Sequence, residues 1–135
     1  MNRLLLITIA VVAALLLISG CTSPQQDILT MYTGSESKFI DIDGLRVHYR
    51  DEGAGPVLLC LHGIQSSLHT WNGWVNVMKN KYRIIRIDLP GWGFTGPSNF
   101  GYKEDKTVAF LKKFIDTMGI KKLYLAGNSY GGFLA

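Results

Sequence analysis

The sequence has few cysteines and no metal-binding motif. Its 135 residues include 2 cysteines, Cys21 and Cys60, too few for a disulfide-stabilised scaffold. Cys60 lies in the apolar run Val57–Leu61, where a cysteine packs as a small hydrophobic side chain. No H-E-x-x-H motif and no cluster of Cys and His at ligand spacing is present. Gly91-Trp92-Gly93 is too short for a dinucleotide-binding motif. The sequence therefore predicts neither a metal nor an organic cofactor.

The sequence also lacks a concentration of charge of either sign. It has 14 Lys and Arg against 10 Asp and Glu, a formal net charge of +4. The basic residues are scattered, and the only adjacent pairs are Lys112-Lys113 and Lys121-Lys122. Because no basic patch with interleaved aromatic residues is present, we expect no binding to nucleic acid.

No apolar run is long enough for an ordinary membrane-spanning helix, which needs roughly 20 residues. Leu4–Ile18 is uncharged, follows a positive start at Arg3 and ends before small residues, which is the layout of a secretory signal peptide. Residues 18–21 read Ile-Ser-Gly-Cys and resemble the lipobox of bacterial lipoproteins. The resemblance implies a signal peptide over residues 1–20 and lipidation of Cys21, which then forms the mature N-terminus.

This resemblance also implies a cellular location. The protein would be lipid-anchored in the bacterial cell envelope, and Thr22, rather than Asp, after the cysteine favours the outer membrane of a Gram-negative cell. More than one acyl chain gives a lasting anchor, because each buried methylene contributes about 0.8 kcal/mol. Residues 21–37 are polar and predict a tether with a short helix near Asp27–Tyr32. The alternative is an uncleaved N-terminal anchor helix in which Cys21 has no role.

The folded domain is predicted over residues 38–135, and it opens with a β-hairpin. Phe39–Asp43 and Leu45–Arg50 each alternate between apolar and polar residues, and Asp43-Gly44 between them is a hairpin turn signal. We expect the two strands to pair antiparallel. His48, in the second strand, is expected to be a surface or edge residue.

Three further strands alternate with two helices after the hairpin. The strands are predicted over residues 57–61, 83–88 and 122–126, and the helices over residues 66–80 and 103–118. The second helix has an apolar stripe formed by Val108, Leu111, Phe114, Ile115 and Met118. Alternation of strand and helix predicts an α/β fold with a parallel sheet and right-handed crossovers.

Three short motifs follow the three parallel strands. Residues 62–64 read His-Gly-Ile, residues 88–93 read Asp-Leu-Pro-Gly-Trp-Gly, and residues 127–131 read Gly-Asn-Ser-Tyr-Gly. The last is a G-x-S-x-G pattern, which places a serine on a strained turn between a strand and a helix. Open α/β sheets place their sites at the carboxyl ends of such strands. The three motifs therefore predict a site that contains Ser129.

With these motifs in this order, the chain resembles the α/β-hydrolase family from about Phe39 to Ala135. Within that family it is most similar to the esterase, lipase-like and carbon–carbon hydrolase branch. Haloalkane dehalogenases and epoxide hydrolases have an aspartate at the nucleophile position, where this chain has Ser129. The resemblance implies an antiparallel hairpin followed by parallel strands with flanking helices, the N-terminal part of an α/β-hydrolase sheet.

The resemblance also implies roles for individual residues. Ser129 would attack a carbonyl carbon of an ester or similar small-molecule substrate and form an acyl-enzyme. The backbone N–H groups of Tyr130 and Ile64 would stabilise the oxyanion of the tetrahedral intermediate. His62 would be a structural part of its loop, and Asp88 would hold its own loop through hydrogen bonds to the backbone.

Ser129 lacks its partners in this sequence. The catalytic acid and histidine follow the serine in the family's chain order, and residues 130–135 contain neither. We therefore expect an incomplete domain, truncated after the nucleophile turn and inactive by itself. A non-catalytic envelope lipoprotein that uses the fold as a binding module is the alternative. The residues present do not separate an esterase from a carbon–carbon hydrolase or an acyltransferase.

Overall fold

The structure is a computed structural model that describes residues 24–135. Cys21 and the predicted signal peptide lie outside these residues. The chain divides into two units, and the second, Glu36–Ala135, contains the sheet. The first contains helix α2 (Pro24–Thr33), which confirms the short helix predicted in the linker. Between residues 24 and 135, no helix combines the length and apolarity needed to cross a bilayer.

The second unit is built around one mixed sheet of five strands in the order β1-β2-β4-β3-β5. The strands are β1 (Lys38–Ile42), β2 (Leu45–Glu52), β3 (Val57–Leu61), β4 (Arg83–Ile87) and β5 (Leu123–Gly127). β1 and β2 form the predicted antiparallel hairpin, and β2 pairs antiparallel with β4. β3 pairs parallel with both β4 and β5. The predicted hairpin followed by parallel strands is thereby confirmed.

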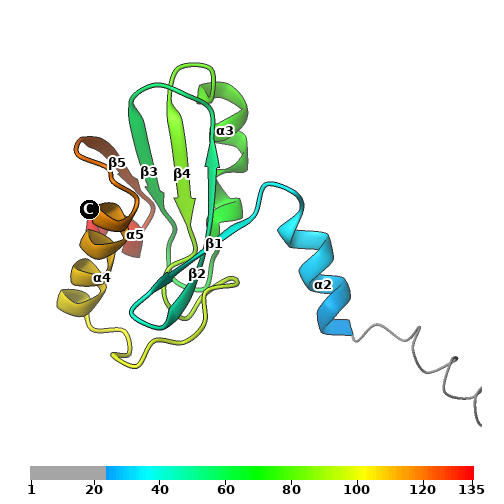
Figure 1. The fold of residues 1–135 in the computed structure, drawn as a ribbon, viewed down its shortest axis with the longest axis vertical. Helices are drawn as coiled ribbons and strands as arrows, with labels where there is room; N and C mark the ends of the chain where they lie inside the picture. Colours follow the sequence, from blue (N-terminus) through cyan, green and yellow to red (C-terminus); the bar gives the residue numbers. More distant parts are fainter. Residues whose placement is uncertain (1–23) are drawn as a thin grey trace, which may run out of the picture. The chain divides into compact units, whose positions relative to one another are not determined.

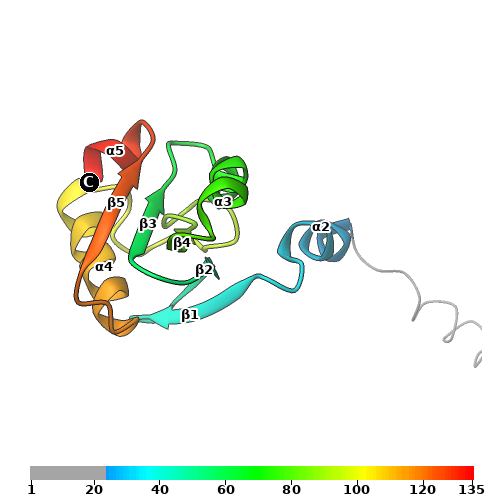
Figure 2. The same cartoon turned by 90° about the horizontal axis from the view of Figure 1, so that it is seen from above.

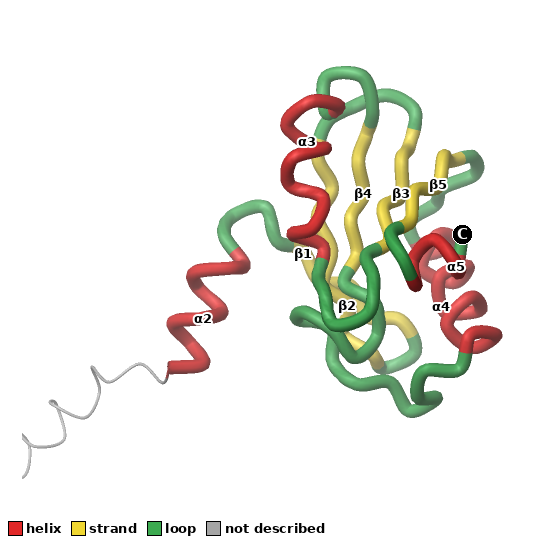
Figure 3. The backbone as a smooth tube through the Cα atoms, turned by 180° about the vertical axis from the view of Figure 1, so that it is seen from behind, coloured by secondary structure: helices red, strands yellow, loops and turns green. Residues whose placement is uncertain are grey.

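Helices cover both faces of this sheet, as Figures 1 and 2 show. The elements are the short 3-10 helix η1 (Leu68–Trp71), α3 (Asn72–Met78), α4 (Glu104–Thr117) and α5 (Tyr130–Leu134). η1 and α3 lie on one face, and α4 and α5 lie on the other. Figure 3 shows the same arrangement from behind, with the loops that follow β3 and β4 near the start of α5.

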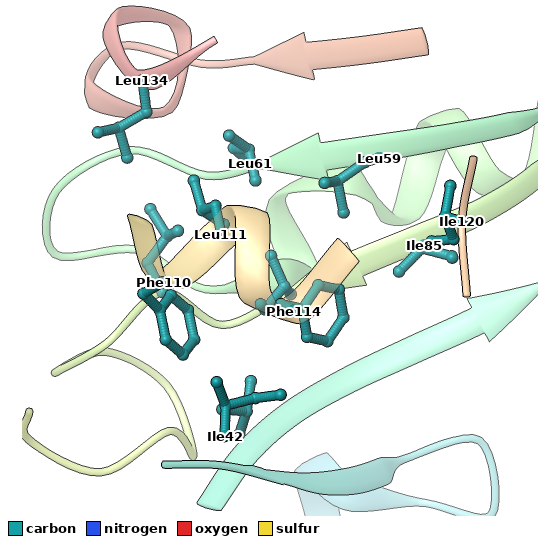
Figure 4. Close-up of a cluster of buried hydrophobic side chains, with 12 residues drawn as sticks. Ile42, Leu59, Leu61, Ile85, Phe110, Leu111, Phe114, Ile120 and Leu134 are labelled. Carbon is teal, nitrogen blue, oxygen red and sulfur yellow. The ribbon is translucent and has the colours of Figure 1, made fainter. Parts of the chain in front are cut away.

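Alternation along the strands divides the buried side chains between two cores. Leu59 and Leu61 of β3 join Phe114 of α4 in the larger core, which Figure 4 shows. Leu58 and Cys60 of the same strand face Trp71 in the smaller core. Cys60 is 1% exposed, and burial raises the pKa of its thiol to about 11. The prediction that Cys60 packs as a hydrophobic side chain is confirmed.

Two predictions about the helices need correction. Val108 is 38% exposed, so it does not belong to the buried stripe of α4. The buried positions of that helix are Thr107, Phe110, Leu111 and Phe114, and the predicted Ile115 and Met118 pack against the same core while partly buried. The single helix predicted over residues 66–80 is instead η1 followed by α3, and the Ser67 side chain caps the start of η1.

β5 is an edge strand among the residues described, since it pairs only with β3. Tyr124 is 57% exposed and Leu125 is 39% exposed. Unpaired backbone groups beside exposed apolar side chains form a template for pairing with another chain. In a polypeptide of these residues alone, this edge is open to pairing with a second copy.

We expect a polypeptide of these 135 residues to associate through β5, and Tyr124→Lys to shift it toward the monomer, because an edge lysine opposes strand pairing. Val77→Lys is the matched control, since Val77 is 78% exposed on α3 and gains the same charge. Size-exclusion chromatography with light scattering measures the difference. Equal association of the two variants would show that β5 is not the contact.

Candidate active site

Ser129 lies on a strained turn between β5 and α5. Its backbone has φ 50° and ψ −116°, and its side chain does not cap the helix. A non-glycine residue in this conformation costs of order 1–3 kcal/mol, which the surrounding structure has to offset. The residue is exposed, so the turn displays the hydroxyl group to solvent. The strand, turn and helix predicted around the G-x-S-x-G pattern are all present.

Both glycines of the pattern are required by close backbone contacts. A Cβ atom on Gly127 would lie 2.2 Å from the carbonyl oxygen of Gly131. A Cβ atom on Gly131 would lie 2.3 Å from the carbonyl oxygen of Leu61. Real Cβ atoms essentially never approach backbone so closely, so any larger residue forces the turn to move. The turn is thereby packed directly against the end of β3.

The loop after β3 lies beside this turn. A Cβ atom on Gly63 would be 3.2 Å from the Cβ atom of Ser129, and the N–H of Asn128 donates to the carbonyl oxygen of Leu61 at 3.0 Å. Ile64 follows in the same loop and its side chain is 60% exposed. The structure therefore brings together Ser129 and the loop that carries the predicted oxyanion donor, Ile64.

Tyr130, which carries the other predicted donor, is the first residue of α5. The first turn of a helix leaves its N–H groups without intrahelical acceptors. The side chain of Tyr130 is half-buried, with its ring centroid 6.0 Å from that of Trp92 and its hydroxyl 3.5 Å from the Thr107 hydroxyl. These contacts hold Tyr130 against α4 and against the loop after β4.

Asp88 organises the loops around the site. Its Oδ1 accepts a hydrogen bond from the N–H of Leu68 at 2.7 Å, and its Oδ2 accepts one from the N–H of Phe94 at 2.8 Å. Burial acts to raise the pKa of this carboxyl. Hydrogen bonds from His48, Leu68 and Phe94 together lower the pKa by more than burial raises it, so the net pKa lies below the usual value. The prediction that Asp88 holds its own loop is confirmed, and the bond to Leu68 extends that role to a second segment.

His48 is the residue that the sequence reasoning misplaced. It is 0% exposed rather than at the surface, and its Nδ1 lies 2.7 Å from Asp88 Oδ2. β2 lies between β1 and β4 in the sheet, so a side chain predicted to be at an edge is in fact central. The alternation within β2 gave no signal of this, because Val47 and His48 are both buried.

His62 is confirmed as a structural part of its loop. Its Nε2 accepts a hydrogen bond from the N–H of Leu89 at 3.0 Å, so Nδ1 carries the proton and donates to the carbonyl oxygen of Gly63 at 2.7 Å. Burial lowers the pKa of the imidazole, although the bond to Gly63 and the charge of Asp88 oppose the shift. A neutral ring with both nitrogens bonded to the main chain cannot act as a base for Ser129.

Residues 24–135 contain no cluster of three or more His, Cys, Asp or Glu side chains arranged to hold a metal ion. What the arrangement offers is a serine hydroxyl on a strained turn, with two loops and a helix N-terminus beside it. These are the elements of a site for nucleophilic attack on a carbonyl group.

Comparison with known proteins places the chain in a family. Residues 56–135, more than half of the chain, match the family described as alpha/beta hydrolase fold. The chain is 37% identical over 122 residues to a 2-hydroxy-6-oxononadienedioate/2-hydroxy-6-oxononatrienedioate hydrolase from Paraburkholderia phymatum. That alignment covers 81% of this chain and 41% of the relative. The chain therefore belongs to the α/β-hydrolase fold family.

Other relatives have different hydrolytic activities. Haloalkane dehalogenase 2 from Mycobacterium tuberculosis is 31% identical over 98 residues, which cover 72% of this chain and 34% of that protein. The crystal structure of an epoxide hydrolase from Vigna radiata superposes with a TM-score of 0.69 at 25% identity, covering 73% of this chain and 33% of that one. The chain thus spans less than half the length of these relatives, all of which are hydrolases.

We expect Gly131→Ala to destabilise the protein by about 1–3 kcal/mol, because the new methyl group overlaps the backbone of Leu61. Gly73→Ala is the matched control, since a Cβ atom there meets nothing within 4 Å, and alanine in a helix is neutral or stabilising by up to ~1 kcal/mol. Urea unfolding followed by tryptophan fluorescence, in the Tyr124→Lys background, measures both. Equal stability of the two variants would contradict the close packing of the turn.

Proposed function

We propose that Ser129 is the nucleophile of a serine hydrolase that acts on a carbonyl substrate. The observation that carries the proposal is the strained Ser129 backbone between two glycines that admit no side chain. A structural serine in a loop does not need such a conformation, which costs free energy and displays the hydroxyl group. The membership of the α/β-hydrolase family supports the same conclusion.

In the proposed reaction, Ser129 Oγ attacks the carbonyl carbon of the substrate and gives up its proton to a base. The negative charge that develops on the carbonyl oxygen is stabilised by the N–H groups of Tyr130 and Ile64. Removing one such donor typically costs on the order of 100–1,000-fold in rate. The tetrahedral intermediate then expels its leaving group, and water hydrolyses the acyl-enzyme.

The base and the acid are not provided by the residues around Ser129. His62 is bonded to the main chain through both ring nitrogens. His48 lies on β2, three strands from β5 in the sheet order, which corresponds to about 14 Å at the usual strand spacing. The proposed activity therefore belongs to a longer polypeptide that supplies the acid and the histidine after Ser129. The 135 residues alone are expected to show no significant turnover.

Two of the relatives favour one substrate class. The hydrolase from Paraburkholderia phymatum is named for a 2-hydroxy-6-oxo dienedioate, a substrate with a ketone carbonyl. A second hydrolase of the same name, from Burkholderia vietnamiensis, is 38% identical over 112 residues. We therefore propose cleavage of a carbon–carbon bond next to a ketone as a candidate reaction beside ester hydrolysis. Both reactions begin with the same attack by Ser129.

We expect a fluorophosphonate probe to label Ser129 in the full-length protein, because an activated serine attacks phosphorus as it attacks a carbonyl carbon. Ser129→Ala should lose this label together with hydrolysis of p-nitrophenyl esters and of a 2-hydroxy-6-oxo dienoate. Ser66→Ala, in the loop before η1, is the matched control and should keep all three. A folded full-length protein without label on Ser129 would contradict the proposal, and ligand binding that survives Ser129→Ala would favour a binding module.

We also propose that the protein is anchored in the bacterial cell envelope through a lipid on Cys21. The apolar Leu4–Ile18 and the Ile-Ser-Gly-Cys segment that follows support this proposal. Cys21→Ser should therefore move the protein from the membrane fraction to the soluble fraction of the envelope. Cys60→Ser is the control and should leave the location unchanged, since Cys60 is buried in the core. Partition into Triton X-114 and cell fractionation measure the change, and membrane retention of Cys21→Ser would support an uncleaved anchor helix.

A further inference from the structure

Ser37, His48 and Asp88 form a second hydrogen-bonded array of a serine, a histidine and an aspartate. His48 Nδ1 lies 2.7 Å from Asp88 Oδ2, and His48 Nε2 lies 2.8 Å from Ser37 Oγ. All three residues belong to the unit Glu36–Ala135. They come from the segment before β1, from β2, and from the end of β4, so the sheet itself brings them together.

The hydrogen bonds to Asp88 limit where the protons can lie in this array. Asp88 also accepts hydrogen bonds from two backbone N–H groups, and these hold its carboxylate in the ionised form. His48 Nδ1 therefore carries a proton and donates a hydrogen bond to Asp88 Oδ2. In the neutral form of His48, Nε2 is then the acceptor, and Ser37 Oγ–H donates to it. This is the arrangement of donors and acceptors that activates a serine nucleophile, which is recognised by geometry rather than by order in the chain.

The surroundings favour a reactive serine over a purely structural one. His48 and Asp88 are both 0% exposed, and the Phe39 and Phe94 rings lie with centroids 5.0 Å and 5.4 Å from the imidazole. These rings hold the histidine and keep water from the buried link. Ser37 is only half-buried, so it is the one residue of the three with access to solvent.

We propose that Ser37 is a second activated serine, which accepts an acyl or phosphonyl group from a small electrophile. With a fluorophosphonate, Ser37 Oγ bonds to phosphorus, fluoride leaves, and the hydroxyl proton passes to His48 Nε2. No other reactant is needed, because the reagent carries its own leaving group. Ser37 lies at the β1–β2 side of the sheet, whereas Ser129 follows β5 at the opposite edge. The inference therefore does not depend on the proposed function of Ser129.

The test uses the Ser129→Ala protein treated with a fluorophosphonate, digested and mapped by tandem mass spectrometry. Ser35 is an internal comparison, because it is exposed and lies in the same tryptic segment. We expect Ser37 to be labelled on the order of 100-fold more than Ser35, the lower range for a positioned general base. His48→Gln should remove most of this preference. Equal labelling of Ser35 and Ser37 in the folded protein would overturn the proposal.

A second pair of variants keeps the proposal testable where His48→Gln fails to fold. Ser37→Cys retains His48 and Asp88, and a thiol beside this histidine should ionise more readily than an ordinary one. We expect iodoacetamide at pH 6.5 to alkylate Ser37→Cys at least ~10-fold faster than Ser35→Cys, because the thiolate is the nucleophile. Tandem mass spectrometry assigns the alkylated residue, because Cys21 lies in the same tryptic segment as positions 35 and 37, whereas Cys60 lies in another. Equal alkylation rates would show that His48 does not activate position 37.

Discussion

The buried carboxylate of Asp88 is the interaction on which the site depends most. It lies at the end of β4 and binds the N–H of Leu68, the N–H of Phe94 and the imidazole of His48. A buried ion is costly unless each of its oxygens is bonded, and here the bonds come from three separate segments. The loop that contains Gly93 also packs closely against Asp88, since a Cβ atom on Gly93 would lie 2.0 Å from Asp88 Oδ2. The charge of Asp88 thus determines how the loops beside the site are folded.

A second constraint connects this network to Ser129. The two loops that follow β3 and β4 are tied by the bond from Leu89 to His62, and His62 in turn holds the carbonyl oxygen of Gly63. Gly63 lies against the serine turn, and Gly131 lies against the last residue of β3. The position of Ser129 is therefore set by backbone-to-backbone contact, which leaves little freedom to relax. A preorganised backbone of this kind is what stabilisation of a developing charge requires.

Much of the fold could be predicted from sequence, because apolar runs and turn residues are local signals. The strands at residues 57–61, 83–87 and 123–127 agree with prediction to within one residue, and the serine turn lies where its pattern places it. The position of β4 between β2 and β3 could not be obtained in this way, since strand order depends on contacts that are remote in sequence. That order buries His48, and this is why a residue expected at an edge became the partner of Asp88. The hydrogen bonds that hold the site cross between strands, so no local pattern reveals them.

A serine nucleophile normally has both a displayed hydroxyl group and a bonded base. Ser129 and Ser37 each have one of these two features. At Ser129 the backbone displays the hydroxyl group, but no base in the described part of the chain is bonded to it. At Ser37 the base is bonded to the hydroxyl, but the serine precedes a strand and no strained turn displays it. The base at Ser37 exists because Asp88 needs a third partner in the interior, and His48 supplies it. A hydrogen bond that stabilises the fold therefore fixes the tautomer that activates Ser37, so stability and reactivity at that position depend on the same carboxylate.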